Sequence, residues 1–137
     1  MSPSNLIAEA FNDIYCTIAP SPSNNGVGVF AIKDIPANTV IFRQGTDYIP
    51  VRSKFLSRIN DKVAEEYRRF LLVDEVKEVV YIPIKGFSSL DISFYTNHNS
   101  KNPTARFDTD SGFIISKRLI EVGEEVTYDY RAKDSRL

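Results

Sequence analysis

Two tyrosines near the end of the chain, Tyr128 and Tyr130, are spaced to form one polar aromatic surface. They lie in the segment GEEVTYDY, which runs from residue 123 to residue 130. Side chains alternate between the two faces of a β-strand, so both phenol rings are expected on the same face. Such a pair can line a narrow slot with apolar walls and polar tips, or it can simply pack within a sheet.

The single histidine of the chain, His98, lies in a second segment that is rich in amide side chains. Residues 94–103 read FYTNHNSKNP and include three asparagines. An asparagine side chain donates and accepts hydrogen bonds at once, which suits a ligand with an amino-acid group or an adenine ring. Asparagine and serine are also typical of ordinary turns, so a binding loop and a plain turn both fit this segment.

Glycines occupy two alternate positions of a third segment, NGVGVFA, at residues 25–31. Because glycine has no Cβ atom, the backbone there can approach a ligand closely and offer it N–H and C=O groups. The same residues also fit a hairpin turn that leads into a strand. The segment is not a dinucleotide-binding fingerprint, since a third glycine and a following helix are missing.

The composition narrows the chemistry that these segments can support. A single cysteine, Cys16, and a single histidine argue against an intrachain disulfide and against a metal site built from such ligands, so no metal is expected. A formal net charge of -1 gives no basic field for nucleic acid, and direct binding to nucleic acid is not expected. Neither a long apolar run nor a secretory leader is recognisable, which predicts an intracellular protein away from membranes; nucleus and cytoplasm are not distinguished.

Short runs rich in Val, Ile, Phe and Tyr, each bounded by turn residues, predict a series of strands. One region differs, because the apolar residues between Lys54 and Val73 recur with the period of a helix. A mostly β domain in small sheets, with one helix inserted midway, follows from this pattern. The predicted strands cover residues 14–18, 27–32, 40–43, 79–84, 105–109, 113–117 and 126–130.

The order of the three polar segments resembles the SET domain family. Residues 26–31 are similar to the first motif of that family, and residues 123–130 to its last. Asn97 and His98 match the centre of its Asn-His-Ser motif, with Pro103 near the expected proline. The resemblance implies a β-clip fold of the SET type: several small curved antiparallel sheets, one inserted helix and a C-terminal pseudoknot.

The resemblance also implies a domain organisation. It extends over most of the sequence, so residues 1–137 are predicted to form a single SET domain with a core of about 14–130. The variable insert of the family would occupy about 48–90. Residues 131–137 would form a short polar tail.

Members of the SET family are protein-lysine N-methyltransferases that use S-adenosylmethionine, and the resemblance implies that activity here. In the family, the cofactor binds on one face of the domain and the target lysine enters from the other through a narrow channel. Tyr130 matches the tyrosine beside the transferring methyl group, and Tyr128 matches a position that tunes the number of methyl groups added. Both are therefore predicted catalytic residues, and a tyrosine at position 128 predicts mainly monomethylation. The predicted cofactor-binding residues are Asn25, Gly26, Val27, Gly28, Phe94, Tyr95, Asn97 and His98.

Two departures from the family pattern keep a second function open. Asn99 separates His98 from Ser100, and Arg43 stands where the family often has a tyrosine. A catalytically inactive SET-derived module that binds proteins is therefore the alternative. In either case the expected partner is a protein with an exposed lysine, for which a histone tail is one candidate. No cysteine-rich segment closes the lysine channel, so a homodimer is one candidate way to complete it.

Overall fold

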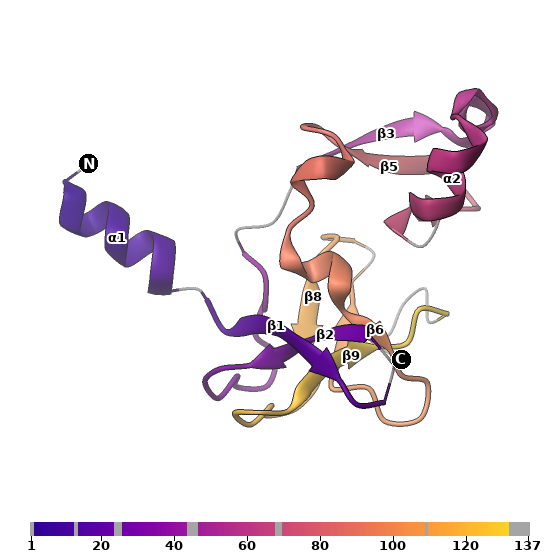
Figure 1. Ribbon diagram of the computed structural model, residues 1–137. Helices are drawn as coiled ribbons and strands as arrows, with labels where there is room; N and C mark the ends of the chain where they lie inside the picture. The colour runs from indigo at the N-terminus through magenta and orange to yellow at the C-terminus, as the bar shows by residue number, and fades with distance from the viewer. Residues whose placement is uncertain are drawn as a thin grey trace. The chain divides into compact units, whose positions relative to one another are not determined.

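The computed structural model describes residues 2–12, 14–23, 26–43, 47–67, 70–108 and 110–131 (Figure 1). Contacts divide the chain into two compact units, Met1–Gly45 with Tyr95–Leu137, and Thr46–Phe94. The second unit interrupts the sequence of the first in the region predicted as the insert. The assignment of the whole chain to a single SET domain, with its core, insert and tail, stays a prediction.

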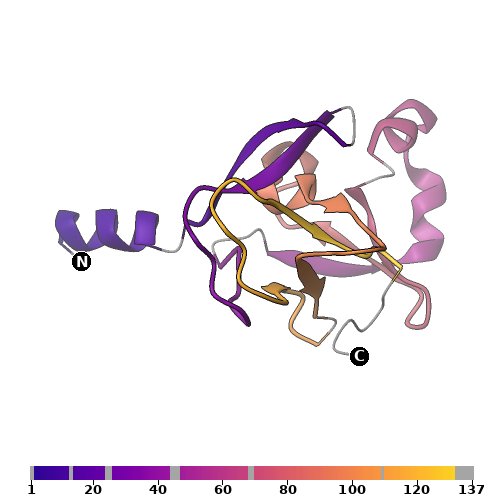
Figure 2. The same ribbon diagram turned by 90° about the horizontal axis from the view of Figure 1, so that it is seen from below.

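The larger unit is built on a four-stranded sheet with the order β1-β2-β9-β6. β1 and β2 form an antiparallel hairpin, and the C-terminal strand β9 pairs with β2 in the antiparallel sense (Figure 2). β6 pairs with β9 in parallel, an exception to the antiparallel sheets that were predicted. The strands are β1 (Cys16–Ser21), β2 (Gly26–Ala31), β6 (Asn97–His98) and β9 (Glu125–Tyr128).

Apolar side chains from β2, β9 and the loops beside them form the core of this unit. Val29 of β2 lies opposite Val126 of β9, and both side chains are fully buried. Ile35 and Ile120 are also fully buried and exchange two backbone hydrogen bonds, at 2.8 and 2.9 Å. This packing fixes the register of β9 against β2, because a one-residue slip would turn Val126 to the opposite face.

A second hairpin in the larger unit joins β7 (Ala105–Phe107) to β8 (Ile114–Ser116). The Gly112 N–H donates to the Asp108 carbonyl at 2.7 Å between these strands, and Gly112 takes a φ of 76° that favours glycine. The strand predicted at residues 40–43 was wrong, since only Val40 forms a bridge there. The segment still runs along β8, because the Ile41 N–H donates to the Ile114 carbonyl at 3.0 Å and the Ser116 N–H donates to the Thr39 carbonyl at 2.9 Å. The Ser116 hydroxyl adds a contact by accepting the Thr39 N–H at 2.9 Å.

The smaller unit contains the antiparallel sheet β3-β5-β4 and a set of aromatic contacts. Tyr67 lies between the rings of Phe70 and Phe87, and Phe94 lies between those of Phe70 and Tyr48. Ring centroids in these pairs are 5.7 to 6.4 Å apart, a normal separation for packed aromatics. Its elements are β3 (Tyr48–Arg52), η1 (Ser53–Arg58), α2 (Asp61–Tyr67), β4 (Leu72–Asp74), β5 (Val79–Pro83), η3 (Phe87–Ser89) and the start of η4 (Ile92–Tyr95).

The single helix predicted from Lys54 to Val73 was wrong in its extent. The chain forms the 3-10 helix η1, turns to an extended conformation at Ile59, and then begins α2. Asn60 explains the break, because its side-chain oxygen accepts the backbone N–H groups of Lys62 and Val63 as an N-cap does. The apolar residues at the far end of the predicted helix belong to β4 instead. The helical spacing of apolar residues therefore continued past the N-cap of α2 and into a strand.

One helix was missed altogether by the sequence analysis. α1 spans Pro3–Asn12 and begins with a proline in its first turn, where the absent N–H costs nothing. Its apolar residues Leu6, Ile7 and Phe11 recur at helical spacing and are all exposed. Among the described residues, no helix is long and apolar enough to cross a membrane.

Candidate active site

The two predicted catalytic tyrosines lie together in an aromatic cluster of the larger unit. The ring centroids of Tyr128 and Tyr130 are 4.9 Å apart. His98 lies 5.1 Å from Tyr130 on one side, and Phe107 stacks on Tyr128 at 6.1 Å on the other. We call these four residues the aromatic cluster. Phe107 was missed from the sequence, although it is the aromatic residue of a predicted strand.

Tyr130 is held by hydrogen bonds from both its side chain and its backbone. Its hydroxyl donates to the carbonyl oxygen of Thr96, and its N–H donates to Nδ1 of His98 at 3.1 Å. Tyr130 is 53% exposed, and the partial burial of its ring, followed by the negative charge of Glu125, raises its pKa. The phenol therefore stays protonated at neutral pH and acts as a hydrogen-bond donor, not as a base.

Tyr128 is a neutral phenol for a similar reason. Burial raises its pKa, and the neighbouring Tyr130 adds a smaller effect in the same direction. A protonated hydroxyl can donate one hydrogen bond and accept others. Tyr128 therefore places a hydroxyl group in a half-buried region that is otherwise formed by aromatic rings.

The tautomer of His98 follows from its contacts. Nδ1 accepts the Tyr130 N–H, so this nitrogen carries no proton and the neutral ring bears its hydrogen on Nε2. Asp129 has a carboxylate oxygen 3.6 Å from Nδ1, which in this state is a close approach and not an ion pair. The backbone N–H of Arg131 donates to the same carboxylate and is the main cause of the lowered pKa of Asp129.

A second group of residues surrounds the carboxylate of Glu125 on β9. One oxygen accepts the Ser21 hydroxyl at 2.8 Å, and the other accepts the Asn97 side-chain N–H at 2.8 Å. The same Asn97 nitrogen donates to the carbonyl of Val27 at 2.9 Å. A Cβ atom on Gly28 would lie 2.5 Å from the Glu125 carboxylate, so a side chain at this position would displace that carboxylate from its hydrogen bonds. We call these five residues the Glu125 cradle.

The fold brings the cradle and the aromatic cluster together through the parallel pairing of β6 with β9. Asn97 lies opposite Thr127, and His98 lies opposite Tyr128. Thr104 reinforces this pairing, because its hydroxyl accepts the Thr127 N–H at 3.0 Å and donates to the Glu125 carbonyl at 3.1 Å. The asparagine-rich turn and the tyrosine strand therefore lie side by side.

Glu125 and Tyr128 point to opposite faces of β9, because they are separated by an odd number of positions along the strand. The face of Glu125 and Thr127 opens on a pocket of about 680 Å³. Loop residues complete its lining with hydroxyl, amide and charged groups, and Val126 and Tyr128 do not contribute. The lining consists of Ser23, His98, Asn99, Ser100, Lys101, Asn102, Thr104, Arg118, Glu124, Glu125 and Thr127.

The predicted cofactor residues are placed unevenly. Val27, Gly28 and Asn97 belong to the cradle, and His98 belongs to both the cluster and the pocket. Val27 takes part through its backbone carbonyl, and both it and Gly26 are exposed on β2. Tyr95 is half-buried in the larger unit, where η4 ends. Phe94 belongs to the smaller unit, with its ring against Tyr48 and Phe70, and Asn25 lies outside the described residues. Ser21 and Glu125 are the cradle residues that sequence reasoning missed, although Glu125 lies within the quoted last motif.

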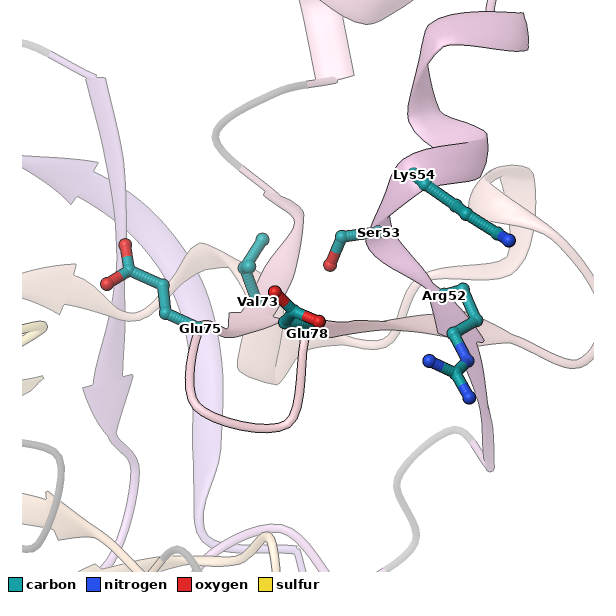
Figure 3. A pocket seen from close by; sticks show the side chains of 6 residues that line it. All are labelled: Arg52, Ser53, Lys54, Val73, Glu75 and Glu78. Carbon is teal, nitrogen blue, oxygen red and sulfur yellow. The ribbon is translucent and has the colours of Figure 1, made fainter.

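A pocket of about 340 Å³ in the smaller unit offers no comparable arrangement (Figure 3). It lies between the end of β3 and the turn from β4 to β5. The charged ends of Lys54 and Glu75 point in opposite directions, so they do not converge on a shared point. Convergent polar groups are what fix a small ligand, and the larger unit therefore holds the better candidate site.

Comparison with known proteins identifies the family. The sequence model of the SET domain matches residues 26–131. This chain belongs to the SET domain family. The human and mouse proteins named histone-lysine N-methyltransferase 2D are each 30% identical to it over 111 residues, which is 77% of this chain. The chain spans 2% of the length of these curated relatives.

Solved structures show the same fold. A crystal structure from Plasmodium falciparum, provisionally named a histone methyltransferase, has a TM-score of 0.55 at 18% identity and covers 85% of this chain and 93% of that chain. A humanised mutant of Polycomb Repressive Complex 2 from Chaetomium thermophilum, bound to an inhibitor, has a TM-score of 0.55 at 19% identity. That match covers 88% of this SET chain and 15% of the other. The predicted SET-type β fold is confirmed.

Proposed function

We propose that this SET domain is a protein-lysine N-methyltransferase that uses S-adenosylmethionine. The observation that carries the proposal is the division of β9 into two faces. Glu125 faces a polar pocket on one side, and Tyr128 faces aromatic rings on the other. This division matches a cofactor bound on one face and a lysine approaching from the other, which is the arrangement of the SET family.

The residues of the cradle suit a cofactor with an amino-acid group and a positive charge. The side-chain amide nitrogen of Asn97 donates to the Glu125 carboxylate and to the Val27 carbonyl. Its side-chain oxygen can therefore accept a hydrogen bond from a donor such as an ammonium. Gly28 permits close approach of the backbone, and His98 presents its remaining N–H. When bound, S-adenosylmethionine would supply a methyl group on a sulfonium; the chain would supply binding and alignment.

The aromatic cluster suits a neutral lysine side chain. A free lysine has a pKa of about 10.4, so it arrives as an ammonium that must lose a proton before it can attack. Burial among rings disfavours the charged form and lowers the lysine pKa. Tyr128 and Tyr130 stay protonated and can orient the amine, while the Tyr130 hydroxyl is itself fixed on the Thr96 carbonyl.

We further propose that the substrate is a lysine of another protein, with a histone tail as the first candidate, and that the product is mainly monomethyl-lysine. The names of the human and mouse relatives support a histone. The Tyr128 hydroxyl supports monomethylation, since it can hold a water in the space that a methylated amine needs. A homodimer stays a proposal for closing the lysine channel.

The alternative is an inactive SET-derived module that binds proteins. The added Asn99 favours it, because its side-chain oxygen accepts the N–H groups of Lys101 and Asn102 and reshapes the loop along the pocket. A module of this kind has no need to retain S-adenosylmethionine. Cofactor affinity therefore separates the two functions.

The test is incubation of the purified chain with methyl-labelled S-adenosylmethionine and a panel of histones and cell extract. Label on a protein lysine, lost in Tyr130→Phe, would support the enzyme and its assigned centre. No label together with no cofactor binding in calorimetry would favour the binding module. Cofactor binding without label would support the assigned cofactor site and would mean that the panel lacked the protein substrate.

A further inference from the structure

Glu125 differs from the other acidic side chains beside the pocket in what its carboxylate contacts. Both of its oxygens accept hydrogen bonds from neutral groups, the Ser21 hydroxyl and the Asn97 amide. Within the described ranges of the chain, no lysine, arginine or histidine forms an ion pair with it. The adjacent Glu124, by contrast, is paired with Arg118 at 2.8 Å.

The position of Glu125 makes the lack of a basic partner among the described residues important. The carboxylate is half-buried, and it lines the polar pocket between Gly28 and Asn97. Partial burial of an anion is unfavourable unless a positive charge or several donors compensate it. Each oxygen accepts one of these two hydrogen bonds and can accept a further one. A cationic ligand in the pocket would complete the environment of this group.

The field of Glu125 also reaches the aromatic cluster. Its negative charge is one cause of the raised pKa of Tyr130, whose backbone N–H binds His98 on the pocket lining. A charge that affects the tyrosine predicted beside the reacting methyl group also acts on a positive charge bound there. Partly buried charges interact more strongly than charges in water, because the surrounding dielectric is lower.

The chemistry of methyl transfer changes the charge of the cofactor. As the amine nitrogen forms its bond to the methyl carbon, the carbon–sulfur bond breaks and its electron pair stays on sulfur. The positive charge passes to the methylated amine, which then loses a proton to solvent. S-adenosylmethionine therefore carries one positive charge more than S-adenosylhomocysteine, and the two are otherwise closely similar in shape.

We infer that Glu125 is a specificity-determining residue, whose carboxylate favours the cationic cofactor S-adenosylmethionine over its uncharged-sulfur product S-adenosylhomocysteine. The inference rests on the proposed function and deepens it, because it names the residue that makes the pocket prefer the positively charged cofactor. Selection against the product would help the site exchange spent cofactor for fresh cofactor.

Calorimetry with the Glu125→Gln variant tests this role. A glutamine can keep the geometry of the cradle, since its oxygen can accept from Asn97 and its N–H can donate to the Ser21 oxygen. Only the charge is lost. We expect the ratio of affinities for S-adenosylmethionine over S-adenosylhomocysteine to fall about tenfold, which corresponds to about 1.4 kcal/mol. Sinefungin, which carries an amine in place of the methylated sulfonium, should lose affinity together with S-adenosylmethionine.

The matched control is Glu121→Gln, which removes the same charge from an exposed residue of the larger unit that does not line the pocket. Its ratio should stay within about twofold of the unaltered protein, because solvent and salt screen an exposed charge outside the pocket. An unchanged ratio in Glu125→Gln, or an equal fall in Glu121→Gln, would overturn the inference while the proposed function stands. Absence of binding to all three ligands in the unaltered protein would overturn both.

A second measurement covers the case in which Glu125→Gln does not fold, as judged by circular dichroism. The unaltered protein should itself bind S-adenosylmethionine and sinefungin more tightly than S-adenosylhomocysteine, and the preference should weaken as salt is added. A preference for S-adenosylhomocysteine over both cations would overturn the inference without any variant.

Discussion

The two units of the molecule differ in how their polar and charged side chains are arranged. In the larger unit, polar side chains from distant segments converge, as Asn97 and Ser21 do on Glu125. In the smaller unit, aromatic side chains pack in a series that includes Tyr67 and Phe70, and the charged groups of its pocket diverge (Figure 3). Convergent polar groups position a ligand, so the difference supports the proposal that the chemistry takes place in the larger unit.

The strongest test of this comparison removes one hydroxyl from each unit. Tyr130→Phe deletes the donor to the Thr96 carbonyl and should lower the rate of methyl transfer about 100-fold, because the ring is no longer held in place. Tyr67→Phe in the smaller unit keeps its ring contacts and should leave the rate within about twofold. Steady-state rates with labelled cofactor measure both. Equal losses would contradict the assignment of chemistry to one unit.

The next test adds a methyl group to a glycine in each unit. Gly28→Ala places a carbon 2.5 Å from the Glu125 carboxylate, so it should lower stability by about 1–3 kcal/mol and abolish cofactor binding. Gly86→Ala meets no atom within 4 Å but imposes an alanine on a φ of +82°. It should lower stability by a similar amount, about 1–3 kcal/mol, with cofactor affinity preserved. Urea unfolding and calorimetry separate the two effects, and retained binding in Gly28→Ala would show that the cradle is not the cofactor site.

Product distribution offers a subtler test of the aromatic cluster. Tyr128→Phe removes the polar tip next to Phe107 and should raise the share of dimethyl-lysine several-fold by freeing space for a methylated amine. Tyr81→Phe on β5 of the smaller unit is the matched control and should leave the product unchanged. Mass spectrometry of the modified protein reads out both. Abundant trimethyl-lysine from the unaltered protein would contradict the proposed monomethylation.

The smallest expected effect concerns a surface ion pair of the larger unit. Two guanidinium contacts from Arg118, and secondly the Glu121 N–H, lower the pKa of Glu124 to about 2. A lowered pKa stabilises the folded state above the unfolded value of about 4.3, and this stabilisation is lost as the pH falls towards about 2.

Arg118→Ala should therefore be less stable than the unaltered protein by about 0.5 kcal/mol at pH 6, since both groups are partly exposed. The difference should shrink towards zero as the pH falls from about 4.3 to about 2. Arg52→Ala in the smaller unit removes an exposed arginine for comparison and should show no such pH dependence. Urea unfolding at a series of pH values measures this, and a constant difference for Arg118→Ala would contradict the assigned pKa.

Local sequence signals predicted individual strands in both units, but not every point at which one element ends and the next begins. Runs of β-branched residues placed β2, β5, β8 and β9 to within a few positions, because alternation along a strand is visible in the sequence itself. The same approach extended one helix across Asn60 into β4, because apolar spacing alone does not reveal a side chain that caps a new helix. α1 was overlooked although its proline and apolar spacing were readable.

The sequence by itself determined the family, the β character and the residue types of the site, because motifs such as GEEVTYDY and Asn97-His98 are contiguous. The tertiary structure alone decided how they meet. The parallel pairing of β6 with β9 sets His98 opposite Tyr128, and the same fold stacks Phe107 on Tyr128 and places Glu125 between Ser21 and Asn97. These contacts join residues far apart in the chain, and their geometry depends on the packed register of β9, which no local pattern specifies.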